Sequence, residues 1–205
     1  MRRRALLTVP PTEDDEAAFD RLVHAVDAAG GAEVEYDAAP PKHAFLRYLL
    51  EHRAVLLHGT GDADITIFEP RRQTDYDNRW TYGVFATDDA VWPIFFAVVN
   101  RPVALSLVNG CSRRDGRSGY YFSIGTDPRR PNAWRTGWIY VLPRPSFTQH
   151  PAGAEWLSPT AVRPLARLRV EPSDFPFLGD VAEHRLGEPV GRIVVRATLL
   201  RALRR

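Results

Sequence analysis

The spacing of apolar residues changes along the chain, from a helical period near the start to short alternating runs further on. Apolar residues between positions 19 and 26 recur at intervals of three and four, which predicts an amphipathic helix. They are Phe19, Leu22, Val23 and Val26. Thr12 can cap this helix, the acidic residues 13–16 suit the positive end of its dipole, and Gly30 and Gly31 end it.

A second helix is predicted from the apolar residues of segment 45–50 and should end near His52. The stretch "AAPPKHAF" between the two helices reads as a hinge or linker. We therefore expect a helical extension over residues 1–40 and one domain over residues 41–205.

From Ala54 onward the pattern is one of short strands separated by turn residues. We predict strands at 54–58, 65–68, 81–86, 103–108, 119–124, 137–142, 154–157 and 162–170. A helix interrupts them, with Asp88 as its cap and Pro93 in its first turn. "CSRRDGRSG" reads as a polar loop, and the terminal "GRIVVRATLLRALRR" fits either a strand or a basic amphipathic helix. Helices followed by many strands predict an α+β fold.

The amino-acid composition limits the classes of protein to which the chain can belong. The 205 residues are 44% hydrophobic, enough for one sizeable core, and 27 basic against 25 acidic side chains leave a net charge of only +2. With a single cysteine, Cys111, no intrachain disulfide or Cys/His metal box is available. Neither a signal peptide nor a run of about 18 apolar residues is visible. We expect a cytoplasmic protein that neither associates with a membrane nor holds a structural metal.

Three segments place polar residues at the ends of apolar strands: "VLLHGT", "YGVFATDDAVWPIFF" and "GAEWLSPTAVRPLARLRV". Taken in this order, they resemble the motif regions of the ADP-ribosyltransferase-like superfamily, in the branch with a His, an aromatic and a Glu around NAD. That branch includes poly-ADP-ribose polymerases, DarT toxins and RNA 2′-phosphotransferases. The resemblance implies a split antiparallel β-sandwich carrying the N-terminal helices, over residues 54–170.

The family's His-Gly-Thr step is matched by His58, Gly59 and Thr60. The resemblance implies that His58 bonds the ribose next to adenine, that the backbone of Gly59 grips the nicotinamide amide, and that Thr60 holds the loop or a ribose. Glycine suits the second role because it lacks a Cβ, so a flat ring can approach the main chain. Alone, the same three residues are also compatible with an ordinary strand and turn.

The second segment implies aromatic contacts with NAD. Phe85 or Val84 takes the place where the family often has tyrosine, and Phe95 or Phe96 would stack on nicotinamide. These rings are equally suited to a core packed on the sheet. Arg71 could meet the pyrophosphate, and Tyr120 could line the pocket. For Arg71 the other interpretation is a solvated loop, and for Tyr120 it is burial in the sheet.

The third segment supplies a carboxylate, Glu155, for which the other interpretation is a surface loop. The resemblance implies that Glu155 stabilises the positive charge that develops as nicotinamide leaves. We expect His58 and Glu155 to face one cleft of an NAD-dependent ADP-ribosyltransferase with an unknown acceptor. The alternatives are NAD hydrolysis, an RNA 2′-phosphotransferase that needs arginines and no Glu, and a non-catalytic domain binding nucleotides or nucleic acid.

Overall fold

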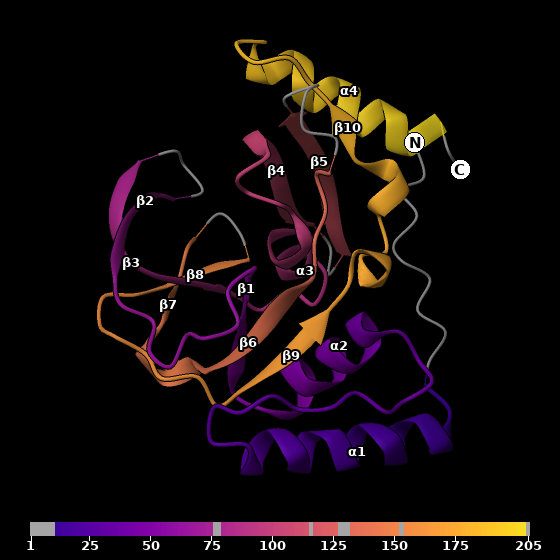
Figure 1. The fold of residues 1–205 in the computed structure, drawn as a ribbon, viewed down its shortest axis with the longest axis vertical. Coiled ribbons are helices and arrows are strands. Elements are labelled where there is room, and N and C mark those ends of the chain that lie inside the picture. Colours follow the sequence, from indigo (N-terminus) through magenta and orange to yellow (C-terminus); the bar gives the residue numbers. More distant parts are fainter. Residues whose placement is uncertain (1–10, 76–78, 115–116, 127–131, 152–153, 204–205) are drawn as a thin grey trace.

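The computed structural model describes residues 11–75, 79–114, 117–126, 132–151 and 154–203. In these residues it contains four α-helices and two β-sheets whose strand pairs are almost all antiparallel. The expected α+β class is therefore confirmed. Figure 1 shows the larger sheet beside α1 and α2, while the smaller sheet lies toward the end that carries α4.

The larger sheet holds most of the segments singled out in the sequence. Its strands run in the order β7-β8-β3-β1-β6-β9, and β2 pairs with β3. Their bounds are β1 Val55–Thr60, β2 Arg71–Thr74, β3 Trp80–Thr87, β6 Gly137–Pro143, β7 Thr148–Gln149, β8 Glu155–Ser158 and β9 Ala166–Val170. "VLLHGT" is thus a central strand, flanked by β3 on one side and β6 on the other.

The smaller sheet has the order β10-β5-β4 and is built around one long hairpin. Its strands are β4 Ala104–Arg114, β5 Arg117–Thr126 and β10 Ala182–Glu183. The polar loop predicted for "CSRRDGRSG" is wrong, because β4 continues to Arg114 and β5 begins at Arg117. Backbone pairing between β4 and β5 continues as far as the pair Arg114 and Arg117. Residues 115–116 lie outside the described residues.

The two N-terminal helices follow the sequence pattern closely. Helix α1, Glu13–Ala28, begins with a capping box in which Thr12 and Asp15 each bond the other's backbone N–H. It ends before Gly30 and Gly31, both of which have positive φ. Helix α2, Lys42–His52, ends where predicted. The apolar stripe of α1 is buried in the main core, and the division at residue 40 stays a prediction.

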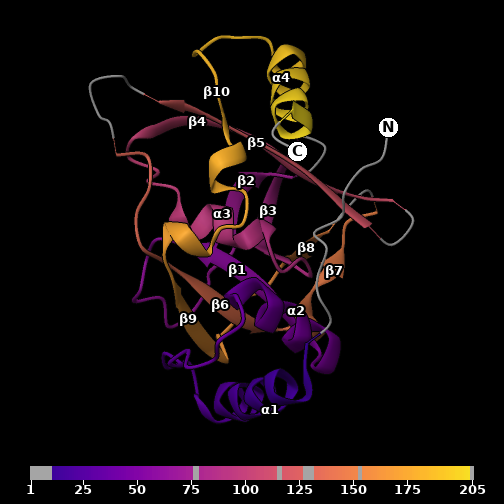
Figure 2. The same ribbon diagram turned by 90° about the vertical axis from the view of Figure 1, so that its right-hand side faces the viewer.

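Helix α3, Trp92–Val98, has Val91 at its N-cap instead of the predicted Asp88, and Val91 makes no side-chain cap bond. The Oδ1 atom of Asp89 accepts the backbone N–H groups of Val91 and Trp92, at 2.9 and 2.8 Å. Pro93 lies in the first turn, as expected. The C-terminal segment is a helix, α4 Val190–Leu203, which packs on β5 of the smaller sheet (Figure 2).

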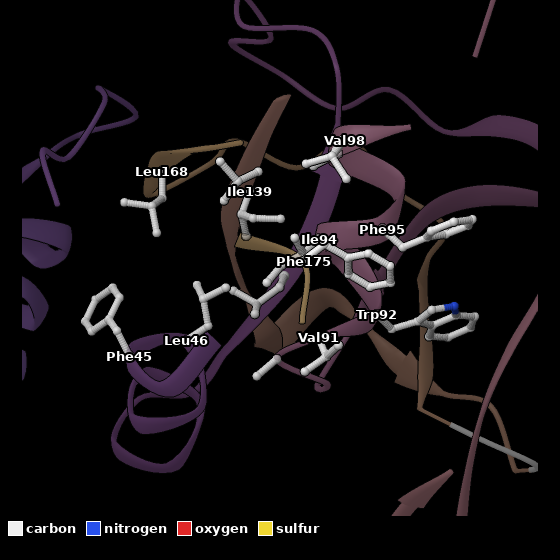
Figure 3. Close-up of a cluster of buried hydrophobic side chains, with 14 of the residues drawn as sticks. Phe45, Leu46, Val91, Trp92, Ile94, Phe95, Val98, Ile139, Leu168 and Phe175 are labelled. Carbon is white, nitrogen blue, oxygen red and sulfur yellow. The ribbon is translucent and has the colours of Figure 1, made fainter. Parts of the chain in front are cut away.

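Two hydrophobic clusters cover the two faces of the larger sheet. The main cluster joins α1, α2 and α3 to β1, β6 and β9 and to the smaller sheet; Figure 3 shows Ile94, Phe95, Ile139 and Phe175 within it. The second cluster lies on the other face. It consists of Leu56, Phe68, Val84, Ala86, Tyr140, Leu142, Phe147, Trp156 and Val162. The sheet is therefore buried on both sides near β1.

Other predictions about strands need correction. The strand expected at 65–68 is absent from these described residues, where only Phe68 forms an isolated bridge with Val162. The strand expected at 162–170 begins at Ala166. Strands β2, β7 and β10 were not predicted, because each has two to four residues and none shows an apolar alternation. The segment 171–184 contains two 3₁₀ turns, Pro172–Asp174 and Leu178–Asp180.

Candidate functional site

Strand β1 keeps its pairing with β6 along its whole length but meets β3 at one position. Six residues of β1, from Val55 to Thr60, stand opposite residues of β6. Between β1 and β3, both fully described, the only paired residues are Leu57 and Thr87. Backbone pairing between these two strands therefore ends after Leu57, at the position of the His-Gly-Thr step. We call this interruption of pairing the opening.

The imidazole of His58 bridges the two strands where their pairing ends. Its Nδ1 lies 2.7 Å from the carbonyl oxygen of Phe85 on β3, and because a carbonyl only accepts, Nδ1 carries the hydrogen. Removal from water lowers the pKa of His58; the bond to Phe85 raises it, and the charge of Arg71 lowers it further. The ring is thus held neutral, with a lone pair on Nε2 that can accept a hydroxyl proton.

The glycines at and after the step both have close neighbours. A Cβ on Gly59 would collide with the carbonyl oxygen of Pro93 in the first turn of α3. A Cβ on Gly61 would overlap the guanidinium of Arg135. Thr60 stands opposite Trp138, and its Oγ1 accepts the backbone N–H of Asp62 at 3.3 Å. The step is therefore packed between α3 and an arginine.

Glu155 lies level with the opening, two strands away from β1. It begins β8 opposite Thr87, which in turn stands opposite Leu57. Residues directly opposite in antiparallel strands share a face, so Glu155, Thr87 and Leu57 point to the side of the main core. His58, the next residue after Leu57, points to the other side. The structure thus brings His58 and Glu155 close along the sheet but on opposite faces, so the expectation that they face one cleft is wrong.

The three predicted phenylalanines differ in how accessible they are. Phe95 is fully buried, with its ring centroid 4.8 Å from that of Phe122, so it belongs to the core. Phe96 is half-buried and contacts the rings of Trp92 and Phe95. Phe85 is half-buried on β3 and shares the face of Thr87. Of the two candidates for stacking on α3, Phe96 is the one whose ring a ligand could reach.

Tyr120 and Arg71 occupy different surroundings. The hydroxyl of Tyr120 donates to Oδ2 of Asp89 at 2.6 Å, and its ring packs against Phe122 and Phe177 in the main core. Arg71 lies exposed on β2, opposite Gly83, and its charge acts on His58. Tyr120 therefore helps to anchor the start of α3, while Arg71 lies on the same strand pair that borders the opening.

Two neighbours of the step were not predicted from the sequence. Arg135 packs on Gly61, and its Nε is buried without a hydrogen-bond partner. The ring of Phe68 lies 4.8 Å from that of His58 and closes the second cluster beneath it. In the sequence, the glycine at position 61 is the feature that indicates a close neighbour. A glycine does not identify which distant residue approaches it.

Among the described residues no group of three or more His, Cys, Asp or Glu side chains is arranged to hold a metal ion. In the same residues no helix is long and apolar enough to cross a membrane. Comparisons of this chain with models of protein families, with curated proteins and with solved structures find no match.

Proposed function

We propose that the protein is an NAD-dependent ADP-ribosyltransferase built on a split antiparallel fold of the ADP-ribosyltransferase type. The observation that carries the proposal is the opening of the larger sheet at His58, with the imidazole bonded to Phe85 across it. The two separate, largely antiparallel sheets and the preceding helices agree with the architecture that the resemblance implies.

The residues at the opening fit the parts of NAD that the resemblance assigns to them. Neutral His58 offers an acceptor nitrogen to a ribose hydroxyl, because its other nitrogen is engaged by Phe85. The guanidinium of Arg135 and that of Arg71 supply positive charge beside the step, as a pyrophosphate requires. Phe96 is the ring available on α3 for the nicotinamide.

The reaction transfers ADP-ribose from nicotinamide to an acceptor. The bond from ribose C1′ to the nicotinamide nitrogen breaks, and its electron pair leaves with nicotinamide. A lone pair of the acceptor attacks C1′, and the acceptor gives up its proton. Glu155 stabilises the positive charge that develops on the ribose in between.

His58 and Glu155 serve different riboses in this proposal. Two strand spacings of about 4.8 Å place the backbone of β8 roughly 10 Å from that of β1. Water reaching C1′ in place of an acceptor would give free ADP-ribose.

The test is the release of nicotinamide from NAD by the purified protein, measured by chromatography. We expect release by the unchanged protein, and a fall of about a hundredfold or more in His58→Ala and in Glu155→Gln, since each loses a group used in the transition state. His24→Ala and Glu51→Gln, both exposed and remote, should keep the full rate. Circular dichroism of each variant separates lost chemistry from lost folding.

Two results would overturn the proposal. One is a protein that neither binds nor consumes NAD. The other is a rate in both His58→Ala and Glu155→Gln equal to that of their controls, which would mean that the opening takes no part in the reaction.

A second candidate is an RNA 2′-phosphotransferase of the same fold, favoured by the placement of Glu155 on the opposite face from His58. Such an enzyme uses arginines and needs no glutamate, and Arg71 and Arg135 both lie near the step. The 2′-phosphate of an oligoribonucleotide would displace nicotinamide from ribose C1′ of NAD, and the phosphate's bond to the RNA would then break, so that the phosphate leaves with ADP-ribose and the RNA keeps a 2′-hydroxyl. Activity of this kind should survive Glu155→Gln and fall in Arg135→Ala, whereas the transferase should lose activity in Glu155→Gln.

A further inference from the structure

Strands β2 and β3 form a two-stranded ribbon at one side of the larger sheet (Figure 1). Arg72 stands opposite Tyr82, and Thr74 stands opposite Trp80. Because paired residues share a face and alternate residues along a strand do so too, these four side chains lie together on one face of the ribbon. We call this set, Arg72, Thr74, Trp80 and Tyr82, the ribbon face.

The ribbon face carries two large aromatic rings that are mostly exposed to solvent. Trp80 is 67% exposed and Tyr82 65% exposed. The guanidinium carbon of Arg72 lies 4.6 Å from the centre of the Trp80 ring, a cation–π contact that keeps the arginine beside the ring. Exposed aromatic groups with an adjoining cation are typical of surfaces that bind another molecule.

The spacing of the two rings selects the kind of partner. Trp80 and Tyr82 are two residues apart, so they stand roughly 6.7 Å apart along the strand. This is about twice the 3.4 Å rise of stacked bases in a duplex. Two neighbouring bases can cover both rings only if they are unstacked from each other, which a single strand allows and a duplex does not.

The charge and the hydrogen-bonding groups of the ribbon face suit an RNA strand as the partner. Segment 71–83 contains three arginines and two aspartates, and the side chain of Arg72 lies on the ribbon face, where it can meet a phosphate. The exposed hydroxyl of Thr74, opposite Trp80, can donate to and accept from a ribose 2′-hydroxyl. We propose that the ribbon face binds single-stranded RNA by stacking bases on Trp80 and Tyr82.

The ribbon face is continuous with the candidate site. Tyr82 lies three residues before Phe85, whose carbonyl accepts the bond from His58, or about 10 Å along β3. A strand bound to the face would therefore present its next nucleotides at the opening of the sheet. That such a strand is the acceptor or the phosphorylated substrate rests on the proposed function, but its binding does not.

The test measures binding to the full chain without NAD, so that its result is independent of nicotinamide release. Fluorescein-labelled oligo-U and oligo-dT strands of equal length, together with an RNA duplex, are titrated at low salt and followed by fluorescence anisotropy. We expect oligo-U to bind more tightly than oligo-dT and the duplex. Trp80→Ala and Tyr82→Ala should each weaken binding of oligo-U about tenfold.

Further variants separate stacking from charge. Arg72→Ala should reduce the slope of log K against log salt by about 0.7, the value for one lost phosphate contact in a single strand. Thr74→Val should remove the preference for RNA over DNA. Leu105→Ala and Arg192→Ala are the matched controls, because both residues are exposed and lie on β4 and α4, away from the ribbon. Both should bind oligo-U like the unchanged protein.

The proposal is overturned if oligo-U does not bind saturably, or if binding survives the double change Trp80→Ala and Tyr82→Ala. Equal or tighter binding of oligo-dT overturns the assignment to RNA. Tighter binding of the duplex overturns the stacking arrangement. Thermal melts followed by circular dichroism show whether each variant remains folded, as expected for changes at exposed side chains.

Discussion

Gly59 illustrates how one residue of the candidate site is fixed by packing as well as by any ligand. The first turn of α3 lies so close to β1 that the carbonyl oxygen of Pro93 fills the space of a Cβ. The glycine therefore has a structural reason to be there, independent of NAD. A ligand that uses the Gly59 backbone would approach from the edge of β1 facing β3, where the pairing has ended.

We predict that Gly59→Ala lowers the free energy of unfolding by about 1–3 kcal/mol, because the added methyl group must push α3 away from β1. Unfolding by urea, followed by tryptophan fluorescence, measures the change. Gly191→Ala is the matched control: nothing lies within 4 Å of the added Cβ, and alanine favours the helix α4 in which it sits. Equal stability of Gly59→Ala and the unchanged protein would contradict the packing shown here.

His184 gives a prediction about pH. Its Nδ1 lies 2.8 Å from Oγ of buried Ser123, and its Nε2 is buried without a partner, so a second proton there would find no acceptor. Burial lowers the pKa of His184 from 6.5, while Glu188 raises it and Arg196 lowers it. The unfolded chain therefore binds more protons below about pH 6.5 than the folded chain does.

The free energy of unfolding should thus be fully retained above about pH 7 and should fall as the pH drops through 6.5. Burial also lowers the pKa values of His43 and His58, which adds to the fall. Urea titrations at pH 7.5 and 5.5 measure it. His184→Gln should show a smaller fall than the exposed control His24→Gln. A fall of the same size in both would show that His184 does not contribute.

At the scale of elements, α4 packs on the smaller sheet through one of its faces. Ile193 is 2% exposed and Ala197 is also buried, while Val195 is 59% exposed. We predict that Ile193→Ala lowers the free energy of unfolding by about 2–4 kcal/mol, through lost burial and the cavity left behind. Val195→Ala, of the opposite face, should change it by less than about 0.5 kcal/mol. Thermal denaturation compares the two, and similar losses would contradict the docking of α4 on β5.

Elements with several agreeing signals were predictable from the sequence. For α1 the cap at Thr12, the apolar stripe and the pair Gly30 and Gly31 all pointed to one helix. Strand β2 gave no such signal, since all four of its residues are exposed and it is held by backbone pairing with β3 and by the contact of Arg72 with Trp80. Backbone pairing leaves no mark on the pattern of hydrophobic residues, which is also why the sequence predicts a loop where the hairpin of β4 and β5 extends.

The candidate site was predictable only in part, for a related reason. His58, Gly59 and Thr60 are adjacent in sequence, so their position at the end of a strand could be inferred. Arg135 and Phe68 reach the step through tertiary packing. The opposite faces of His58 and Glu155 depend on the register of three strands, and a single residue of slip would reverse the result.

At the scale of the whole molecule, α1 is joined to the rest by burial as well as by chain connection. Its side chains Phe19, Leu22, Val23 and Val26 belong to the same cluster as residues of α2, α3 and the larger sheet. Phe19 packs against Phe45 and Tyr48 of α2, with ring centroids 5.7 and 5.4 Å apart. Removing α1 would expose this part of the main core to water.

We therefore predict that residues 41–205 alone are much less stable than the full chain, although the sequence suggested a division at residue 40. Four buried apolar side chains of α1 contribute on the order of 1.5–3 kcal/mol each before entropy is counted. Urea unfolding of the full chain should show one transition. A shortened chain that unfolds at the same urea concentration as the full chain would contradict the prediction and would identify residues 1–40 as an accessory segment.

The opening beside β1 also bears on self-association. Unpaired strand edges commonly lie at the margin of a sheet, where a strand of another molecule can add to them and start aggregation. Here pairing is interrupted inside the sheet, with β3 on one side, β6 on the other and α3 packed against Gly59. A foreign strand would have to displace β3 to reach that backbone. The interruption of pairing beside β1 therefore does not expose a strand edge at the margin of the sheet.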